Sequence, residues 1–258
     1  MPEPPMIQLE HVSKSYDGVP ALRAVDLSVP KGCFLALIGG SGSGKTTLLK
    51  TINRLIEADG GRIHIDGRAV EAGPAHLLRR HIGYVFQGIG LFPHMSVAEN
   101  IGITPKLLGW SAANIAARVA ELLDLVQLPQ DFATRLPAAL SGGQAQRVAV
   151  ARALAANPSI MLMDESFGAL DPVTRTALGS EYRRLHEQLG LTTVMVTHDV
   201  LEAVLLADRI VVLRDGEVVA EDTPRALLAS HEDPGVEALM QGPRLQAEKL
   251  GALTGEGP

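Results

Sequence analysis

A glycine-rich segment, GGSGSGKT at residues 39–46, has the residue types and spacing of a loop that holds phosphate. It follows an apolar stretch typical of a strand and precedes a stretch with helical periodicity. Glycines allow backbone N–H groups to turn inward around a phosphate, while the Lys45 ammonium can reach the terminal phosphates and the Thr46 hydroxyl can ligate Mg²⁺. The sequence therefore predicts a nucleotide site formed by Gly39, Gly40, Ser41, Gly42, Ser43, Gly44, Lys45, Thr46 and Thr47.

Two adjacent carboxylates, Asp164 and Glu165, follow the apolar run 160–163. This run is typical of a buried parallel strand, which would place both residues at the C-terminal edge of the sheet, beside the phosphate loop. Asp164 is positioned to hold Mg²⁺ through water, because Mg²⁺ keeps several waters in nucleotide sites. Glu165 points in another direction, and we expect it to polarise the water that attacks the terminal phosphate.

Further polar residues lie where predicted strands end. Gln87 closes IGYVFQ, His198 closes TTVMVTH, and Asp171 follows the carboxylates in GALDP. The carboxyl ends of parallel strands meet at one edge of a sheet, so we expect His198 beside the terminal phosphate, close to Lys45.

The elements that must position these residues alternate between strand and helix. Helical periodicity is expected at 45–56, 96–109, 111–126, 141–154, 174–190, 199–207 and from near 224, with short strands between most of these segments. The alternation around a phosphate loop predicts a doubly wound α/β core, interrupted by a helical insertion.

Composition limits the classes of function. The net charge of −6 gives no basic field for nucleic acid, so no nucleic-acid partner is expected. Cys33 is the single cysteine and lies in an apolar run, which indicates a buried structural thiol and a reducing compartment. No signal segment and no apolar run of bilayer length is found, so we expect a cytoplasmic chain whose membrane partner is another polypeptide.

A second segment is suited to an anion. Ser141, Gly142, Gly143 and Gln144 open a predicted helix, whose free N–H groups and positive dipole end favour phosphate. The chain from 6 to about 222 carries, in order, GGSGSGKTT, VFQ, LSGGQ, IMLMDE, GALD and TH. These segments resemble the Walker A loop, Q-loop, signature, Walker B strand, D-loop and switch of the ATP-binding cassette family of transporter ATPases.

The resemblance implies a P-loop NTPase fold in the α/β class, with an N-terminal antiparallel β part and a helical subdomain inserted at about 93–156. In this family two cassettes pair head to tail, so the chain would form a homodimer when ATP is bound. The signature of one copy would then close over ATP held by the other. By the same resemblance Tyr16 would stack on adenine, Asp171 would belong to the nucleotide site, Lys45 and Gln87 would join Glu165 and His198 in catalysis, and the Mg²⁺ ligands would be Thr46, Gln87 and Asp164.

Membrane partners are also implied by the resemblance. Residues 87–103 correspond to a groove for a permease subunit, although packing between the two subdomains explains the same apolar residues equally well. Segments 48–68, 84–101 and 162–175 are similar to importers of glycine betaine, choline or carnitine. The chain would then hydrolyse ATP at the cytoplasmic face of the cell membrane and be served indirectly by an extracytoplasmic solute-binding protein.

Other interpretations remain. One is an importer of another small solute, such as an amino acid or a polyamine. Another is a soluble cassette ATPase acting on DNA or the ribosome, although those relatives usually carry two cassettes or a long coiled-coil insertion. A non-hydrolysing nucleotide switch is disfavoured because Lys45, Glu165 and His198 are all present.

Two departures from the family pattern are visible. Ser166 replaces the proline that usually follows the Walker B glutamate, which restores a backbone N–H and loosens φ next to Glu165. The second departure is the tail, because several relatives append regulatory domains to the cassette. Here we expect residues 1–222 to form the cassette and 223–258 a short helical tail without a regulatory domain.

Overall fold

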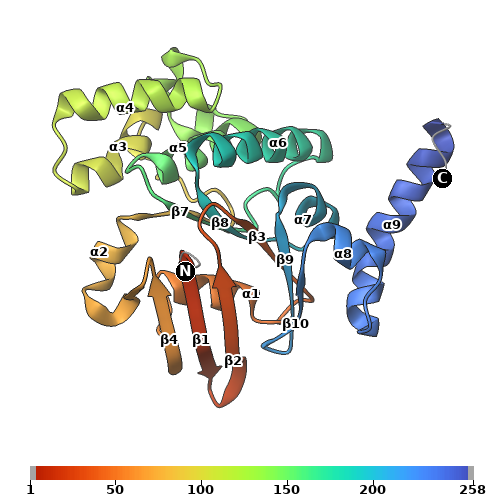
Figure 1. The fold of residues 1–258 in the computed structure, drawn as a ribbon. Helices are drawn as coiled ribbons and strands as arrows, with labels where there is room; N and C mark the ends of the chain where they lie inside the picture. Colours follow the sequence, from red (N-terminus) through yellow and green to blue (C-terminus); the bar gives the residue numbers. More distant parts are fainter. Residues whose placement is uncertain (1–3, 255–258) are drawn as a thin grey trace.

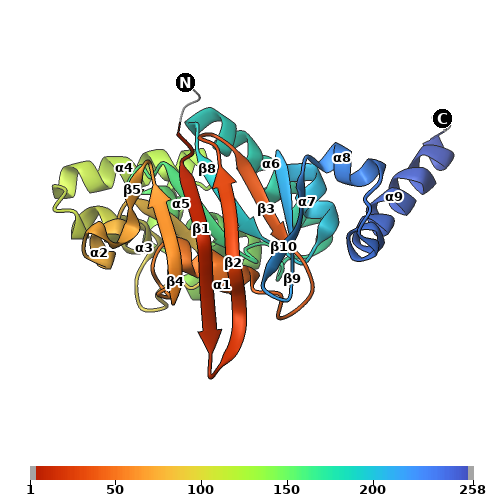
Figure 2. The ribbon, with the colours of Figure 1, turned by 60° about the horizontal axis from the view of Figure 1, so that its bottom comes forward.

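Two sheets form the centre of the computed structural model, which describes residues 4–254 (Figure 1). The smaller sheet has the order β2-β1-β4-β5, and each of its pairs is antiparallel. Its strands are β1 (Ile7–Tyr16), β2 (Val19–Val29), β4 (Gly60–Ile65) and β5 (Arg68–Ala69). In Figure 2 this sheet faces the viewer and lies over helix α1 (Lys45–Ile52). It is the antiparallel part implied by the resemblance.

The larger sheet has the order β10-β9-β3-β8-β7-β6. Its parallel strands are β3 (Phe34–Ile38), β6 (Ile82–Val85), β7 (Ile160–Asp164), β8 (Thr192–Val196) and β9 (Arg209–Arg214), and β10 (Glu217–Asp222) returns antiparallel beside β9. Every residue of β3, β7 and β8 is buried, as expected for parallel strands covered on both faces. The predicted α/β class with a mostly parallel core is confirmed.

The two faces of β3 belong to different hydrophobic cores. Phe34, Ala36 and Ile38 pack with the helical layer, while Leu35 and Leu37 pack beneath the antiparallel sheet and α1. This alternation follows from the two-residue period of a strand. One strand therefore joins both cores and fixes the start of the phosphate loop, which begins directly after Ile38.

Helices inserted between β6 and β7 form a layer of their own, at the top of Figure 1. They are α3 (Val97–Leu107), α4 (Ala112–Leu125) and α5 (Gly142–Leu154), with the 3₁₀ turns η2 (Gln130–Thr134) and η3 (Pro137–Ala139). Ser96, Ser111 and Ser141 cap the three helices by accepting a backbone N–H three residues on. The helices predicted at 96–109 and 111–126 are confirmed.

The remaining helices are η1 (Val70–Ala72), α2 (Ala75–Arg79), α6 (Pro172–Leu189), α7 (Val200–Leu206), α8 (Pro224–Ala229) and α9 (Pro234–Thr254). Sequence reasoning missed β5 and α2. It also extended α1 to residue 56, whereas the helix ends at Ile52 and Arg54 takes a left-handed φ of 54°.

A single last helix from near 224 is wrong, because the tail forms two helices. Asp233 separates them by accepting the Gly235 and Val236 N–H groups, with Pro234 in the first turn of α9. The predicted cassette and tail also include residues 1–3 and 255–258, which lie outside the described part. None of the helices within residues 4–254 is both long enough and apolar enough to span a bilayer.

Candidate functional site

The glycine loop connects the buried strand β3 to helix α1, as the sequence predicts. Two of its glycines are required by geometry. Gly39 has φ 146° and a Cβ there would lie 2.1 Å from Leu213 O, while Gly44 has φ 100° and a Cβ would lie 2.4 Å from Ala21 O. Side chains at these positions would therefore clash with backbone. The loop is closely fitted between β2 and the β9–β10 hairpin.

Lys45 is buried at the start of α1, and its ammonium group forms hydrogen bonds with the glycine loop. Lys45 Nζ donates to Gly39 O at 3.0 Å, to Gly40 O at 2.7 Å and to Ser43 Oγ at 3.2 Å. Burial lowers the pKa of the Lys45 ammonium below its usual value, and the Glu165 carboxylate opposes part of that shift. The ammonium is thus held by weak neutral acceptors that a phosphate oxygen can replace.

Asp164, at the end of β7, meets Thr46 from α1. Thr46 Oγ1 donates to Asp164 Oδ1 at 3.0 Å, and the Asp164 side chain is almost fully buried. The structure therefore brings together the hydroxyl and the carboxylate predicted to hold Mg²⁺. No cluster of three or more His, Cys, Asp or Glu side chains suited to a metal exists within the described part of the chain.

Two neighbours of Asp164 were missed by sequence reasoning. Tyr84 OH donates to Asp164 Oδ2 at 3.2 Å, and Lys50 Nζ lies 3.6 Å from the same oxygen. Burial, reinforced by Asp164, raises the pKa of the Tyr84 phenol, which keeps it a hydrogen-bond donor. Lys50 follows Thr46 by four residues, so helical spacing could have found it. Tyr84 depends on the pairing of β6 with β7, which spacing alone does not show.

The Glu165 carboxylate lies close to polar side chains that follow the two strands beside β7. Gln87 Nε2 donates to Glu165 Oε2 at 2.8 Å, and His198 Nδ1 lies 3.7 Å from the same oxygen. These residues follow β6, β7 and β8, which are neighbours in the sheet. Gln87 and His198 are exposed, so the group faces solvent. The structure thus assembles the carboxylate, amide and imidazole that the sequence placed on one edge.

Ser166 affects the backbone beside this group. Glu165 has a left-handed φ of 45°, and its N–H donates to Val196 O at 3.0 Å. The buried Ser166 hydroxyl donates to Val85 O at 3.4 Å, on the neighbouring strand β6. Serine therefore adds a cross-strand contact that proline cannot make, next to a residue in a strained conformation.

The signature segment opens α5, away from the glycine loop of the same chain. Ser141 Oγ accepts from Gln144 N at 3.3 Å, and Gln144 Oε1 accepts from Ser141 N at 2.9 Å, which is a capping box. A Cβ on Gly143 would lie 2.9 Å from the Thr174 methyl, so the segment packs against the start of α6. No hydrogen bond among the described residues connects this segment to residues 39–47.

Asp171 and Tyr16 lie on different elements, before α6 and at the end of β1. Asp171 caps α6 by accepting from Thr174 N at 3.0 Å, and hydrogen bonds from the side chain and backbone of Thr174 hold the pKa of the Asp171 carboxyl below its usual value. Tyr16 ends β1 with an exposed ring, paired in register with Val19. Val19 and Gly42 line one cleft of about 600 Å³, so the hairpin that carries Tyr16 lies beside the glycine loop.

A groove of about 540 Å³ lies between the core and the helical layer, next to Gln87. Phe86, Phe92 and Leu107 are exposed along it, with Arg79, Arg80 and Arg152 around them; among the described residues no Asp or Glu lines it. The apolar residues of 87–103 divide between two roles. Val97 and Ile101 are buried in the core, whereas Phe92 and Ile103 line the groove.

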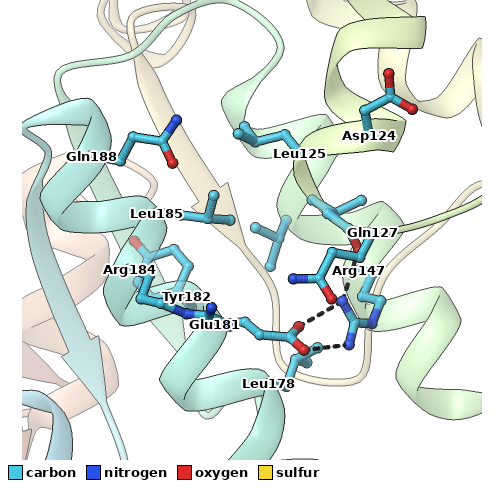
Figure 3. A pocket seen from close by; sticks show the side chains of 12 residues that line it. Asp124, Leu125, Gln127, Arg147, Leu178, Glu181, Tyr182, Arg184, Leu185 and Gln188 are labelled. Carbon is cyan, nitrogen blue, oxygen red and sulfur yellow. Dashed lines mark hydrogen bonds and ion pairs between the residues drawn. The ribbon is translucent and has the colours of Figure 1, made fainter.

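Another cavity, whose lining side chains are drawn in Figure 3, lies between the end of α4, α5 and α6 and has a volume of about 320 Å³. Its wall includes an ion pair in which Arg147 Nη1 lies 2.6 Å from Glu181 Oε2, and the same nitrogen donates to Val126 O at 2.8 Å. This arginine therefore joins all three helices. None of the predicted site residues lines this cavity, so it is separate from the group around Glu165.

Comparisons with known proteins agree with this geometry. The sequence pattern of the ABC transporter family matches residues 22–168, more than half of the chain. The chain belongs to the ABC transporter family. Over 93% of this chain it is 49% identical to the carnitine transport ATP-binding protein OpuCA of Listeria monocytogenes. Over 86% of this chain it is 51% identical to the glycine betaine uptake system ATP-binding protein YehX of Escherichia coli (strain K12).

The structure also resembles solved cassettes. A dimeric, post-hydrolysis form of the ATP-binding cassette MJ0796 bound to ADP and Pi matches with a TM-score of 0.77 and 37% identity, covering 85% of this chain and 99% of that one. Among the relatives, the chain spans 61% of OpuCA and 72% of YehX. A sulfate/thiosulfate import ATP-binding protein, CysA of Bacillus cereus, is 47% identical over 89% of this chain and 65% of its own length.

Proposed function

We propose that the chain is the ATP-hydrolysing subunit of a membrane importer. The observation that carries this proposal is the convergence of Gln87 and His198 on the Glu165 carboxylate, beside the Thr46–Asp164 pair. A carboxylate at this position can take a proton from a water that attacks the γ-phosphate. Gln87 would orient that water, and His198 would contact the γ-phosphate. A switch that only binds nucleotide has no use for such a group.

The glycine loop would hold the phosphates of ATP. Its backbone N–H groups would surround the β-phosphate, and the Lys45 ammonium would exchange the carbonyls of Gly39 and Gly40 for phosphate oxygens. The adenine ring would stack on the exposed ring of Tyr16.

A magnesium ion fits the donors present. Mg²⁺ prefers hard oxygen donors and keeps several of its waters. The Thr46 hydroxyl and the Asp164 carboxylate, whose oxygens are 3.0 Å apart, would hold the ion, the hydroxyl directly and the carboxylate through water. Gln87 would supply a further oxygen from its side chain. The bound ion would neutralise charge on the β- and γ-phosphates.

Two copies would pair head to tail when ATP is bound. The signature supports this, because within residues 4–254 no side chain accepts from the Gly142 or Gly143 N–H group, and no hydrogen bond joins the segment to the glycine loop of its own chain. These N–H groups and the dipole of α5 would complete the ATP site of the partner copy. Asp171, which begins α6 beside the signature, would lie at the same interface.

The membrane partner would dock in the groove next to Gln87. Its exposed aromatic residues and its excess of arginine fit a short apolar helix that carries a carboxylate. The chain would thereby sit at the cytoplasmic face of the membrane, attached through a permease that receives solute from an extracytoplasmic binding protein. Names of relatives at about 50% identity favour a quaternary-ammonium osmoprotectant such as glycine betaine, choline or carnitine as that solute.

Reconstitution tests this proposal directly. The chain, its permease and the binding protein are placed in liposomes, and ATP-driven uptake of labelled glycine betaine, choline and carnitine is compared with that of sulfate, an amino acid and a polyamine. We expect uptake of glycine betaine, choline or carnitine and no uptake of the other solutes. Uptake of another solute would overturn the substrate class, and tight co-sedimentation with ribosomes in place of a membrane protein would overturn the transport function.

A further inference from the structure

Arg175, on the first turn of α6, connects two loops that flank Glu165. Its Nη2 donates to Gly168 O at 3.2 Å and to Leu170 O at 3.0 Å, both in the turn between Glu165 and α6. Its Nη1 donates to Asp199 Oδ2 at 3.0 Å, in the residue that follows His198. One guanidinium therefore holds the D-loop and the loop that carries the switch histidine.

The two loops are also in contact beside the catalytic group. A Cβ on Gly168 would lie 3.2 Å from His198 Cε1, so the imidazole rests against this glycine. The Gly168 N–H donates to Glu165 O at 3.2 Å. The position of the turn therefore bears on both the imidazole and the carboxylate, which are 3.7 Å apart.

Asp199 fixes the other side of this bridge. Its Oδ1 caps α7 by accepting from Leu201 N at 3.0 Å and Glu202 N at 3.2 Å, while Oδ2 receives the arginine. The side chains of Arg175 and Asp199 are 23% and 32% exposed, so the pair is only partly screened by water. The planar guanidinium of arginine has several N–H donors in fixed directions and can reach all three acceptors at once, whereas the single ammonium of lysine cannot.

We propose that Arg175 is a positioning residue for ATP hydrolysis. It holds the His198 imidazole and the turn at Gly168 in the correct position relative to the Glu165 carboxylate. This inference rests on the proposed ATPase function and deepens it. The three hydrogen bonds of Arg175 all go to these two loops, so the proposal gives its side chain no direct contact with nucleotide. Its loss should therefore change the rate of the chemical step and leave ATP affinity nearly unchanged.

The test uses the purified full chain and compares kcat and KM for ATP in three variants. Arg175→Met should lower kcat about 10-fold with KM within about twofold, since small misplacements of catalytic groups cost up to about 100-fold. Arg175→Lys should restore little of the loss. Asp199→Asn keeps the cap of α7 but weakens the ion pair, and should lower kcat about threefold.

A double-mutant cycle and a matched control separate positioning from stability. Asp199→Asn should have no further effect in the Arg175→Met background. Arg183, on the same helix, contacts Asp208 and Leu206 O in the same manner but far from Glu165, so Arg183→Met should lower the melting temperature and leave kcat unchanged.

Unchanged kcat in Arg175→Met, or effects of Arg175→Met and Asp199→Asn that multiply, would overturn the inference. If Arg175→Met does not fold, Arg175→Lys and Asp199→Asn decide in the same way. Absence of ATP hydrolysis in the unaltered chain would instead refute the proposed function.

Discussion

Replacement of Glu165 by glutamine removes the proposed base and little else. Glutamine has the same size and keeps an oxygen that can accept the 2.8 Å hydrogen bond from Gln87 Nε2. The side chain is 27% exposed, and the buried Lys45 ammonium keeps its hydrogen bonds to Gly39 O, Gly40 O and Ser43 Oγ. We therefore expect the variant to fold and bind ATP normally, and to accumulate as an ATP-bound dimer.

The size of the effect follows from the loss of proton transfer alone. Removal of a positioned general base lowers rates about 10²- to 10⁴-fold, which corresponds to about 3–5 kcal/mol in the barrier. Phosphate release at saturating ATP measures kcat, equilibrium binding measures the affinity for ATP, and gel filtration with ATP measures the dimer.

A matched control is Glu121→Gln, which alters an exposed carboxylate paired with Arg118 on the helical layer. It should change turnover little, because exposed ion pairs contribute at most about 1 kcal/mol. Turnover of Glu165→Gln within twofold of the unaltered chain would refute the assignment of Glu165 as the base.

Tyr16→Ala should weaken ATP binding about fivefold, because about 1 kcal/mol of ring stacking is lost. Val19→Ala, at the position paired with Tyr16 on the neighbouring strand, serves as the control. Equal dissociation constants for Tyr16→Ala and the unaltered chain would exclude the stacking role. Ser141→Arg should leave ATP binding to the monomer intact but abolish ATP-dependent pairing on gel filtration, and a normal dimer peak would contradict the role given to the signature. Burial raises the pKa of the Cys33 thiol from 9.0 to about 11. The contribution of the protonated thiol to the free energy of unfolding is therefore fully present below pH 9 and is lost as the pH rises through about 11, by up to about 3 kcal/mol. Cys33→Ala should flatten this alkaline decline in the free energy of unfolding, and parallel pH profiles of the two chains would contradict the prediction.

Local features of this protein were determined by the sequence alone. The glycine loop, the apolar strand before it and the helices at 96–109 and 111–126 depend on neighbouring residues, and each was predicted correctly. The break before α9 depends equally on local chemistry, and sequence reasoning overlooked it although Asp233 followed by Pro234 is a typical helix start.

Only the tertiary structure decided which residues meet. Gln87, Glu165 and His198 are far apart in the chain and come together because β6, β7 and β8 are adjacent in the sheet, an order that hydrophobic periodicity does not contain. Tyr84 and Arg175 were missed for the same reason, since their partners Asp164 and Asp199 lie on other elements. Periodicity reports the face that a residue presents, whereas strand order and helix packing set its neighbours, because these depend on long-range burial of apolar surface.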